Sequence, residues 1–161
     1  MTDFRQLLAA LATERANFIL IRGAAAIVHG STHVTQALDV VYDRSPDNLR
    51  RIARALAPHR PYLRDVPPGL PFLLDAATLE RGMNFTLTTT LGEIVLLGEI
   101  TGGGTYVTLS SHCVELEVFG TRALCLDLPT LIAVKRAADR PKDLAAIAEL
   151  ECVLDEDEGT R

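Results

Sequence analysis

The stretch Arg22–Tyr42, RGAAAIVHGSTHVTQALDVVY, decides the fold that we expect for this chain. Gly23 follows an apolar run that is typical of a buried strand, and the residues from Ala24 to His29 favour a short helix. A turn at Gly30–Thr32 comes next, and Ala37–Tyr42 then has the composition of a second strand. The pattern predicts a strand, a glycine turn, a short helix and a strand that contains one aspartate.

This order of elements suits the binding of a triphosphate and a metal ion. Glycine at a strand-to-helix turn lets the backbone approach phosphate oxygens, and the N-terminus of the helix offers them free N–H groups. Residues i and i+2 of the following strand share one face, where carboxylates can hold magnesium ions that orient an attacking hydroxyl group. Gly23 is therefore a candidate phosphate-binding residue, although a glycine that merely ends a strand would look the same.

Asp39 is the strongest single candidate for a catalytic and metal-binding residue. It stands between Leu38 and Val40 in an apolar strand. A carboxylate in such a place costs free energy unless it is bound or paired, and perturbed ionisable groups gather at functional sites. We therefore expect Asp39 to belong to a site.

The remaining sequence predicts one α/β domain with a mixed sheet of five or six strands. A length of 161 residues suits a single domain. From apolar periodicity and glycine turns we expect helices at 4–11, 46–56, 127–138 and 144–154, and strands at 17–22, 84–89, 93–97, 114–119 and 122–126. We expect an ordered surface loop at the proline-rich residues 58–71, a mobile loop at Gly102–Gly104, and a frayed acidic tail at 155–161 beyond a domain of residues 1–154.

Composition excludes several classes of protein. Lys and Arg total 16 and Asp and Glu total 21, so the net charge is −5, which does not suit a protein that coats nucleic acid by charge alone. No apolar run reaches the roughly 18 residues of a membrane span, and the first residues do not resemble a signal peptide. Three widely spaced cysteines predict free thiols in a cytoplasmic protein, with no disulfide framework and no zinc site.

The quoted stretch resembles the small prokaryotic nucleotidyltransferases of the DNA polymerase β-like superfamily, many of which are encoded in toxin–antitoxin operons. Their pattern is roughly G-G-x-A-x-x-x-H-G-x-x-R-x-T-x-D-x-D. The matching residues here are Gly23, Ala26 (one place off), His29, Gly30, Thr35 and Asp39. The resemblance runs from about residue 15 to 150 and includes the segments SPDNL and LIAVKRAADRPKDL. It implies a nucleotidyltransferase fold, a magnesium cofactor and a nucleoside triphosphate as substrate or ligand.

Four departures from this pattern lie at positions that the resemblance links to phosphate binding, metal binding or catalysis. Ala24 replaces a second glycine, and His33 replaces an arginine. Ala37 replaces the first carboxylate of the D-x-D pair, and Val95, in GEIVLL, stands where the family has a third carboxylate. Two metal ions need several bridging carboxylates, and the attacking hydroxyl group needs a base. The resemblance therefore implies a fold whose magnesium binding is weak or absent and whose nucleotidyl transfer is impaired or lost.

Several further residues are candidates for the site. Glu93 survives near the lost carboxylate and is a candidate metal ligand, the alternative being a solvated hairpin residue. The resemblance implies phosphate contacts from the glycine turn and from a basic motif, and the candidates are Gly23, Ala24, Ser31, Lys135, Arg140 and Lys142. The alternatives are a simple turn residue for Ser31 and a solvated patch for the basic residues. His29 is expected to cap or pack at the end of its helix.

Three functions stay open from the sequence. The first is a nucleotide-binding protein with impaired or lost nucleotidyl transfer, whose partner is an antitoxin-like protein or RNA. The second is an active, metal-dependent enzyme that transfers a nucleoside monophosphate to a protein, RNA or small hydroxyl acceptor. The third is a non-catalytic protein-interaction module, for example a homodimer. None of the three involves a membrane.

Overall fold

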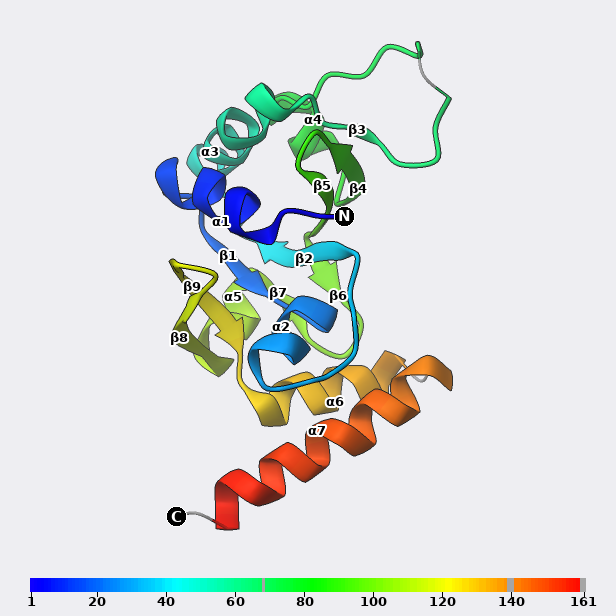
Figure 1. Ribbon diagram of the computed structural model, residues 1–161. Coiled ribbons are helices and arrows are strands. Elements are labelled where there is room, and N and C mark those ends of the chain that lie inside the picture. Colours follow the sequence, from blue (N-terminus) through cyan, green and yellow to red (C-terminus); the bar gives the residue numbers. More distant parts are fainter. Residues whose placement is uncertain (68, 139–140, 160–161) are drawn as a thin grey trace.

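A mixed sheet of seven strands, in the order β3-β4-β5-β2-β1-β9-β8, organises the chain (Figure 1). The computed structural model describes residues 1–67, 69–138 and 141–159, and the side chains of 1–67, 69–138 and 144–156. Within these residues the strands are β1 (Phe18–Leu20), β2 (Ala37–Tyr42), β3 (Tyr62–Leu63), β4 (Asn84–Thr89), β5 (Gly92–Leu97), β8 (Cys113–Val118) and β9 (Thr121–Leu126), with β6 (Glu99–Ile100) and β7 (Gly104–Thr105) in a separate ribbon. The expected α/β class and mixed sheet are confirmed, but the sheet has seven strands where five or six were expected.

Helices gather at the two ends of this arrangement. They are α1 (Phe4–Thr13), α2 (Arg22–Val28), α3 (Pro46–Leu56), α4 (Ala76–Arg81), α5 (Tyr106–Leu109), α6 (Leu128–Ala138) and α7 (Pro141–Gly159). α1, α3 and α4 lie at one end of the molecule, and α6 and α7 pack against each other at the other end (Figure 1). α2 contacts β2, β9 and α6, so it links the sheet to the second helical layer.

Local sequence signals explain why the outer helices form and which faces they bury. The Asp3 side chain accepts a hydrogen bond from the Gln6 backbone N–H at 3.0 Å and so caps α1, whose leucines Leu7, Leu8 and Leu11 are all buried. Pro46 opens α3, where its fixed φ angle suits the first turn. These apolar faces join the strands in one core.

The middle of the sheet combines both strand directions. β2 pairs antiparallel with β1 and parallel with β5, while β1 also pairs parallel with β9. Alternate residues of β2 face opposite ways: Leu38 and Val40 are buried, whereas Ala37 and Asp39 are partly accessible. Asp39 therefore lies on the face of the sheet opposite to that of Leu38 and Val40.

The structure corrects several predicted boundaries. β1 is shorter than the expected strand because Arg22 adopts a left-handed backbone conformation, φ 52°, and turns the chain directly into α2. Gly102–Gly104 is not a free loop: it forms the turn of the β6–β7 ribbon, where the Gly103 N–H donates to the Ile100 carbonyl. The proline-rich stretch contains a short strand, β3. Two helices, α4 and α5, were not predicted. Helix α7 continues to Gly159, into the expected acidic tail.

Among the residues that the structure describes, no helix is long and apolar enough to cross a membrane.

Candidate functional site

The paired strands β2 and β5 bring together the two predicted metal ligands, Asp39 and Glu93, and the two positions, Ala37 and Val95, at which the resemblance implies a replaced carboxylate. Asp39 is the register partner of Val95, and Ala37 is the partner of Glu93. Partners in a parallel ladder point to the same face, as do residues i and i+2 of one strand. Ala37, Asp39, Glu93 and Val95 therefore share one face. Two of these four positions now carry apolar side chains.

A cavity of about 330 Å³ opens over Asp39. It is bounded by α2, by the loop between α2 and β2, by β2, and by α6 and α7. Four residues predicted for the site line it, namely Gly23, Ser31, Asp39 and Lys135. Arg22, His33 and Thr35 line it as well, although the sequence had not identified Arg22 as a site residue. Residues that are far apart in the chain thus meet at one place.

Among the described residues, the cavity is lined by two cationic side chains, Arg22 and Lys135, and one carboxylate, Asp39. Arg22 Nη1 lies 3.9 Å from Asp39 Oδ2, and the Asp39 side chain is only 13% exposed. Lys135 is 8% exposed, an unusual burial for a lysine. Because a partly desolvated site weakens screening, cations here attract an anionic ligand more strongly than exposed ones would.

An apolar cavity adjoins the charged one. It has a volume of about 220 Å³ and shares Arg22 and Lys135 with the first cavity. Its other lining residues are Ile100, Thr101, Leu131, Val134 and Ala138. The two cations therefore lie between a polar compartment and an apolar one.

Glu93 lines a neighbouring cavity, which shares Val34 and Thr35 with the cavity over Asp39. The neighbouring cavity, of about 400 Å³, is also lined by Thr2 and Gln36. The Glu93 carboxylate is engaged by Arg64, with Nη1 to Oε2 at 3.1 Å. In the described part of the chain no group of three or more His, Cys, Asp or Glu side chains could hold a metal ion. The residues present do not fit a two-metal centre, so we derive no chemical step through magnesium.

Other predicted residues fall outside the cavity or outside the described residues. Ala24 is buried in α2 and is not part of the cavity lining. Arg140 lies outside the described residues, and so does the side chain of Lys142. The α2 helix has seven residues and begins at Arg22, directly beside the cavity.

His29 has the packing role expected for it. It is the C-terminal cap residue of α2, and its Nε2 lies 2.7 Å from the Leu126 carbonyl oxygen and 3.8 Å from the Cys125 thiol. Burial raises the pKa of the Cys125 thiol to about 12, so this thiol stays protonated and non-nucleophilic at neutral pH. The contact between His29 and Cys125 is therefore part of the core.

The α2–β2 loop is attached to α7 by a contact that the sequence analysis missed. Glu149 of α7 accepts a hydrogen bond from the Thr32 backbone N–H at 2.5 Å, and its Oε2 lies 3.5 Å from His33 Nε2. The Thr32 N–H holds the pKa of the Glu149 carboxyl below its usual range. No local pattern marks Glu149 for this role, because its partners lie more than a hundred residues earlier in the chain.

Gly23 is required by the close approach of the same loop. A Cβ atom placed on Gly23 would lie 2.7 Å from Thr35 Oγ1 and 2.8 Å from Thr35 Cβ. The structure thus accounts for this glycine by packing against protein, without reference to a phosphate group. The loop from Ser31 to Thr35 and the start of α2 form one wall of the cavity.

We expect Gly23→Ala to lower the free energy of unfolding by about 1–3 kcal/mol, because the new methyl group must displace Thr35. Denaturant unfolding measures the change. In the double variant Gly23→Ala/Thr35→Gly the contact is absent, so the two substitutions should couple favourably. Additive effects of the two substitutions would contradict this account of Gly23.

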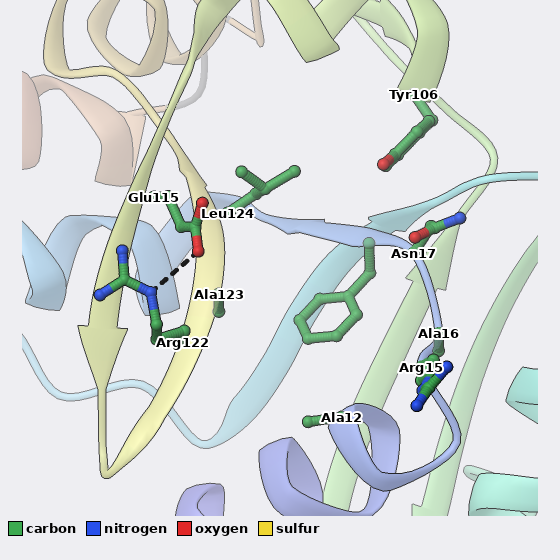
Figure 2. A pocket seen from close by; sticks show the side chains of 10 residues that line it. Ala12, Arg15, Ala16, Asn17, Tyr106, Glu115, Arg122, Ala123 and Leu124 are labelled. Atoms are coloured by element: carbon green, nitrogen blue, oxygen red, sulfur yellow. Dashed lines mark hydrogen bonds and ion pairs between the residues drawn. The ribbon is translucent and has the colours of Figure 1, made fainter.

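Another cavity, of about 370 Å³, lies near the start of β1, away from these residues (Figure 2). Tyr106 of α5 and the exposed pair Glu115–Arg122 of the β8–β9 hairpin line it, with Oε1 to Nε at 2.9 Å. These two charges satisfy each other in contact with solvent, where ion pairs contribute little. None of the residues predicted for the site lines this cavity, so the cavity over Asp39 is the candidate site.

Comparison of the chain with protein-family models and with curated proteins gave no match.

Proposed function

We propose that this protein binds a nucleotide and is a relative of the nucleotidyltransferases that its sequence resembles, with impaired or lost nucleotidyl transfer. The observation that carries the proposal is the burial of Lys135, together with Arg22, at the cavity over Asp39. A buried lysine beside a partly exposed arginine at one cavity favours a ligand with several negative charges. A polyphosphate chain has this chemistry.

The neighbouring compartment suits the remainder of a nucleotide. Ligand sites are mostly apolar, with a few polar groups that fix orientation. The cavity beside Lys135 has this composition: besides the two cations, Thr101 is a polar lining residue, and Leu131 and Val134 are among the apolar ones. In the proposed complex the phosphates contact Arg22 and Lys135, and the base enters the apolar compartment.

The same arrangement disfavours transfer of the bound nucleotide. Transfer needs a base to accept the proton of the attacking hydroxyl group, and metal ions to stabilise the leaving pyrophosphate. Val95 has no proton acceptor, Ala37 has no ligand atom, and the Glu93 carboxylate already contacts Arg64. Asp39 is then the only carboxylate of the proposed set that faces the cavity.

Calorimetric titration of ATP, GTP, CTP and UTP, each with magnesium and with EDTA, tests the proposal. We expect at least one nucleotide to bind with a Kd on the order of micromolar, and the affinity to survive EDTA because Arg22 and Lys135 provide the attraction. Lack of binding by all four nucleotides in both conditions would refute the proposed function.

Lys135→Met should weaken this binding about tenfold to a hundredfold, since a charge-assisted hydrogen bond is worth about 1.5–3 kcal/mol. Methionine keeps most of the length of the buried side chain. The matched control is Arg136→Met, which removes the same charge from an exposed position of the same helix. Equal affinities of the two variants would contradict the role of Lys135, provided that both unfold at the temperature of the parent protein.

A chemical measurement on the unaltered protein gives an independent test. The chain has only two lysines, Lys135 and Lys142, so an amine-reactive reagent produces few products. We expect a bound nucleotide to protect Lys135 from labelling, as read by mass spectrometry of peptides. Undiminished labelling of Lys135 at saturating nucleotide would place the ligand elsewhere.

A further inference from the structure

The contact between α7 and the α2–β2 loop has the form of an occupied anion site. The Glu149 carboxylate receives the Thr32 backbone N–H at 2.5 Å and the Thr32 hydroxyl group at 3.3 Å. His33 Nε2 lies 3.5 Å from the second carboxylate oxygen. A backbone N–H, a hydroxyl group and an imidazole are donors that proteins also present to phosphate oxygens.

The position of Glu149 is set by the burial of its own helix. Ile147 and Leu150 are buried where α7 packs against the rest of the fold. These anchors bracket Glu149 and hold it beside the loop. The carboxylate can leave by a change of side-chain rotamer while the helix stays in place.

The turn that binds Glu149 borders the candidate site. Ser31 and His33 on either side of Thr32 line the cavity over Asp39, and Ala146, one turn before Glu149, lines it too. An anion in that cavity would therefore lie close to the groups that donate to Glu149. The negative charges of the anion and of the Glu149 carboxylate would repel each other.

We propose that the turn Ser31–His33 is a phosphate-binding site whose resident anion is the carboxylate of Glu149. A phosphate group of the ligand displaces Glu149 from the Thr32 N–H when it binds. The inference rests on the proposed function for the natural ligand, a nucleotide. The exchange itself concerns any phosphate. Glu149 thus acts as a built-in competitor that sets the affinity of the site.

The experiment uses inorganic phosphate and pyrophosphate as probes, with the Thr32 and His33 backbone amides followed by NMR. Glu149→Ala removes the competing charge, and we expect phosphate to bind at the Thr32 amide about tenfold more tightly than in the parent protein. Glu149→Gln keeps the shape of the side chain and should give an intermediate gain. Glu151→Ala is the control: it removes an exposed carboxylate of the same helix, which pairs with Arg136, and should change nothing at Thr32.

The sign of the change decides between two roles for Glu149. If Glu149 merely positions the loop, both substitutions weaken phosphate binding or leave it unchanged, and the proposal is overturned. It is likewise overturned if phosphate shifts amides elsewhere but not that of Thr32. Should α7 loosen in Glu149→Ala, the Glu149→Gln variant carries the test. A protein that binds no nucleotide, yet gains phosphate binding at Thr32 in these variants, would refute the proposed function and retain this inference.

Discussion

The double variant Ala37→Asp/Val95→Asp is expected to bind Mg²⁺ or Mn²⁺ and to be stabilised by it. Asp39 pairs with Val95 across parallel strands, and Ala37 shares the face of Asp39 on β2. Neighbouring strands lie about 4.8 Å apart, so three carboxylates at these positions converge on one point. At a metal concentration one hundred times the Kd, binding adds about 2.7 kcal/mol to the free energy of unfolding.

In EDTA the same variant should be less stable than the parent protein. Val95 is 7% exposed, and a carboxylate introduced there loses hydration beside two other negative charges. The metal response should vanish as the pH falls, because the ligand carboxylates must be deprotonated to bind. Thermal unfolding with metal and with EDTA, at several pH values, measures both effects.

The control for this variant is Ala37→Asn/Val95→Asn, which has nearly the same shape and polarity without the charge. We expect no metal response from it. A folded aspartate double variant that ignores metal would contradict the three-carboxylate geometry of β2 and β5. It would also remove the support that the β2–β5 pairing gives to a nucleotidyltransferase-like arrangement of carboxylates.

Asn48→Leu is expected to lower the free energy of unfolding by about 3–5 kcal/mol. Asn48 is fully buried in α3 and makes three hydrogen bonds to backbone: its Oδ1 accepts from the Asn17 N–H at 2.7 Å, and its Nδ2 donates to the carbonyls of Asn17 at 3.0 Å and Asp43 at 2.7 Å. Asn17 precedes β1 and Asp43 follows β2, so one side chain joins the helix to the central strand pair. Each buried polar group left without a partner costs about 1–3 kcal/mol.

The matched control is Asn17→Ala, which alters the other side chain at the same junction. The Asn17 side chain is exposed, and its contacts with Asn48 use the backbone only. We expect a change within about 0.5 kcal/mol. For a domain of this size the loss in Asn48→Leu corresponds to a fall in Tm of about 6–20 °C. Equal stabilities of the two variants would contradict the stabilising role that we assign to the hydrogen bonds of the Asn48 side chain.

Features set by neighbouring residues were predictable without coordinates. The strand Ala37–Tyr42 and the hairpin of β4 and β5 appear where apolar alternation and turn residues predicted them. Periodicity depends on residues a few positions apart, and these remain neighbours whatever the rest of the chain does. The end of β1 before Arg22 was not predicted, because arginine rarely adopts the left-handed backbone conformation that Arg22 has here.

The composition of the site depended on contacts between distant segments. Sequence spacing made Glu93 a candidate metal ligand, and the fold adds a contact of its carboxylate with Arg64, from the region before α4. Gly23 was a candidate phosphate-binding residue, and the fold adds its close approach to Thr35.

The order of residues along this chain was enough to establish its α/β class, most of its helices and strands, and the face of β2 on which Asp39 lies. Only the tertiary structure revealed Arg22 at the cavity over Asp39 and the contact of Glu149 with the Thr32 turn. The physical reason is the range of the interactions. Secondary structure follows from hydrogen bonds and apolar periodicity within a few residues, whereas burial and pairing of a charge depend on every segment that packs around it.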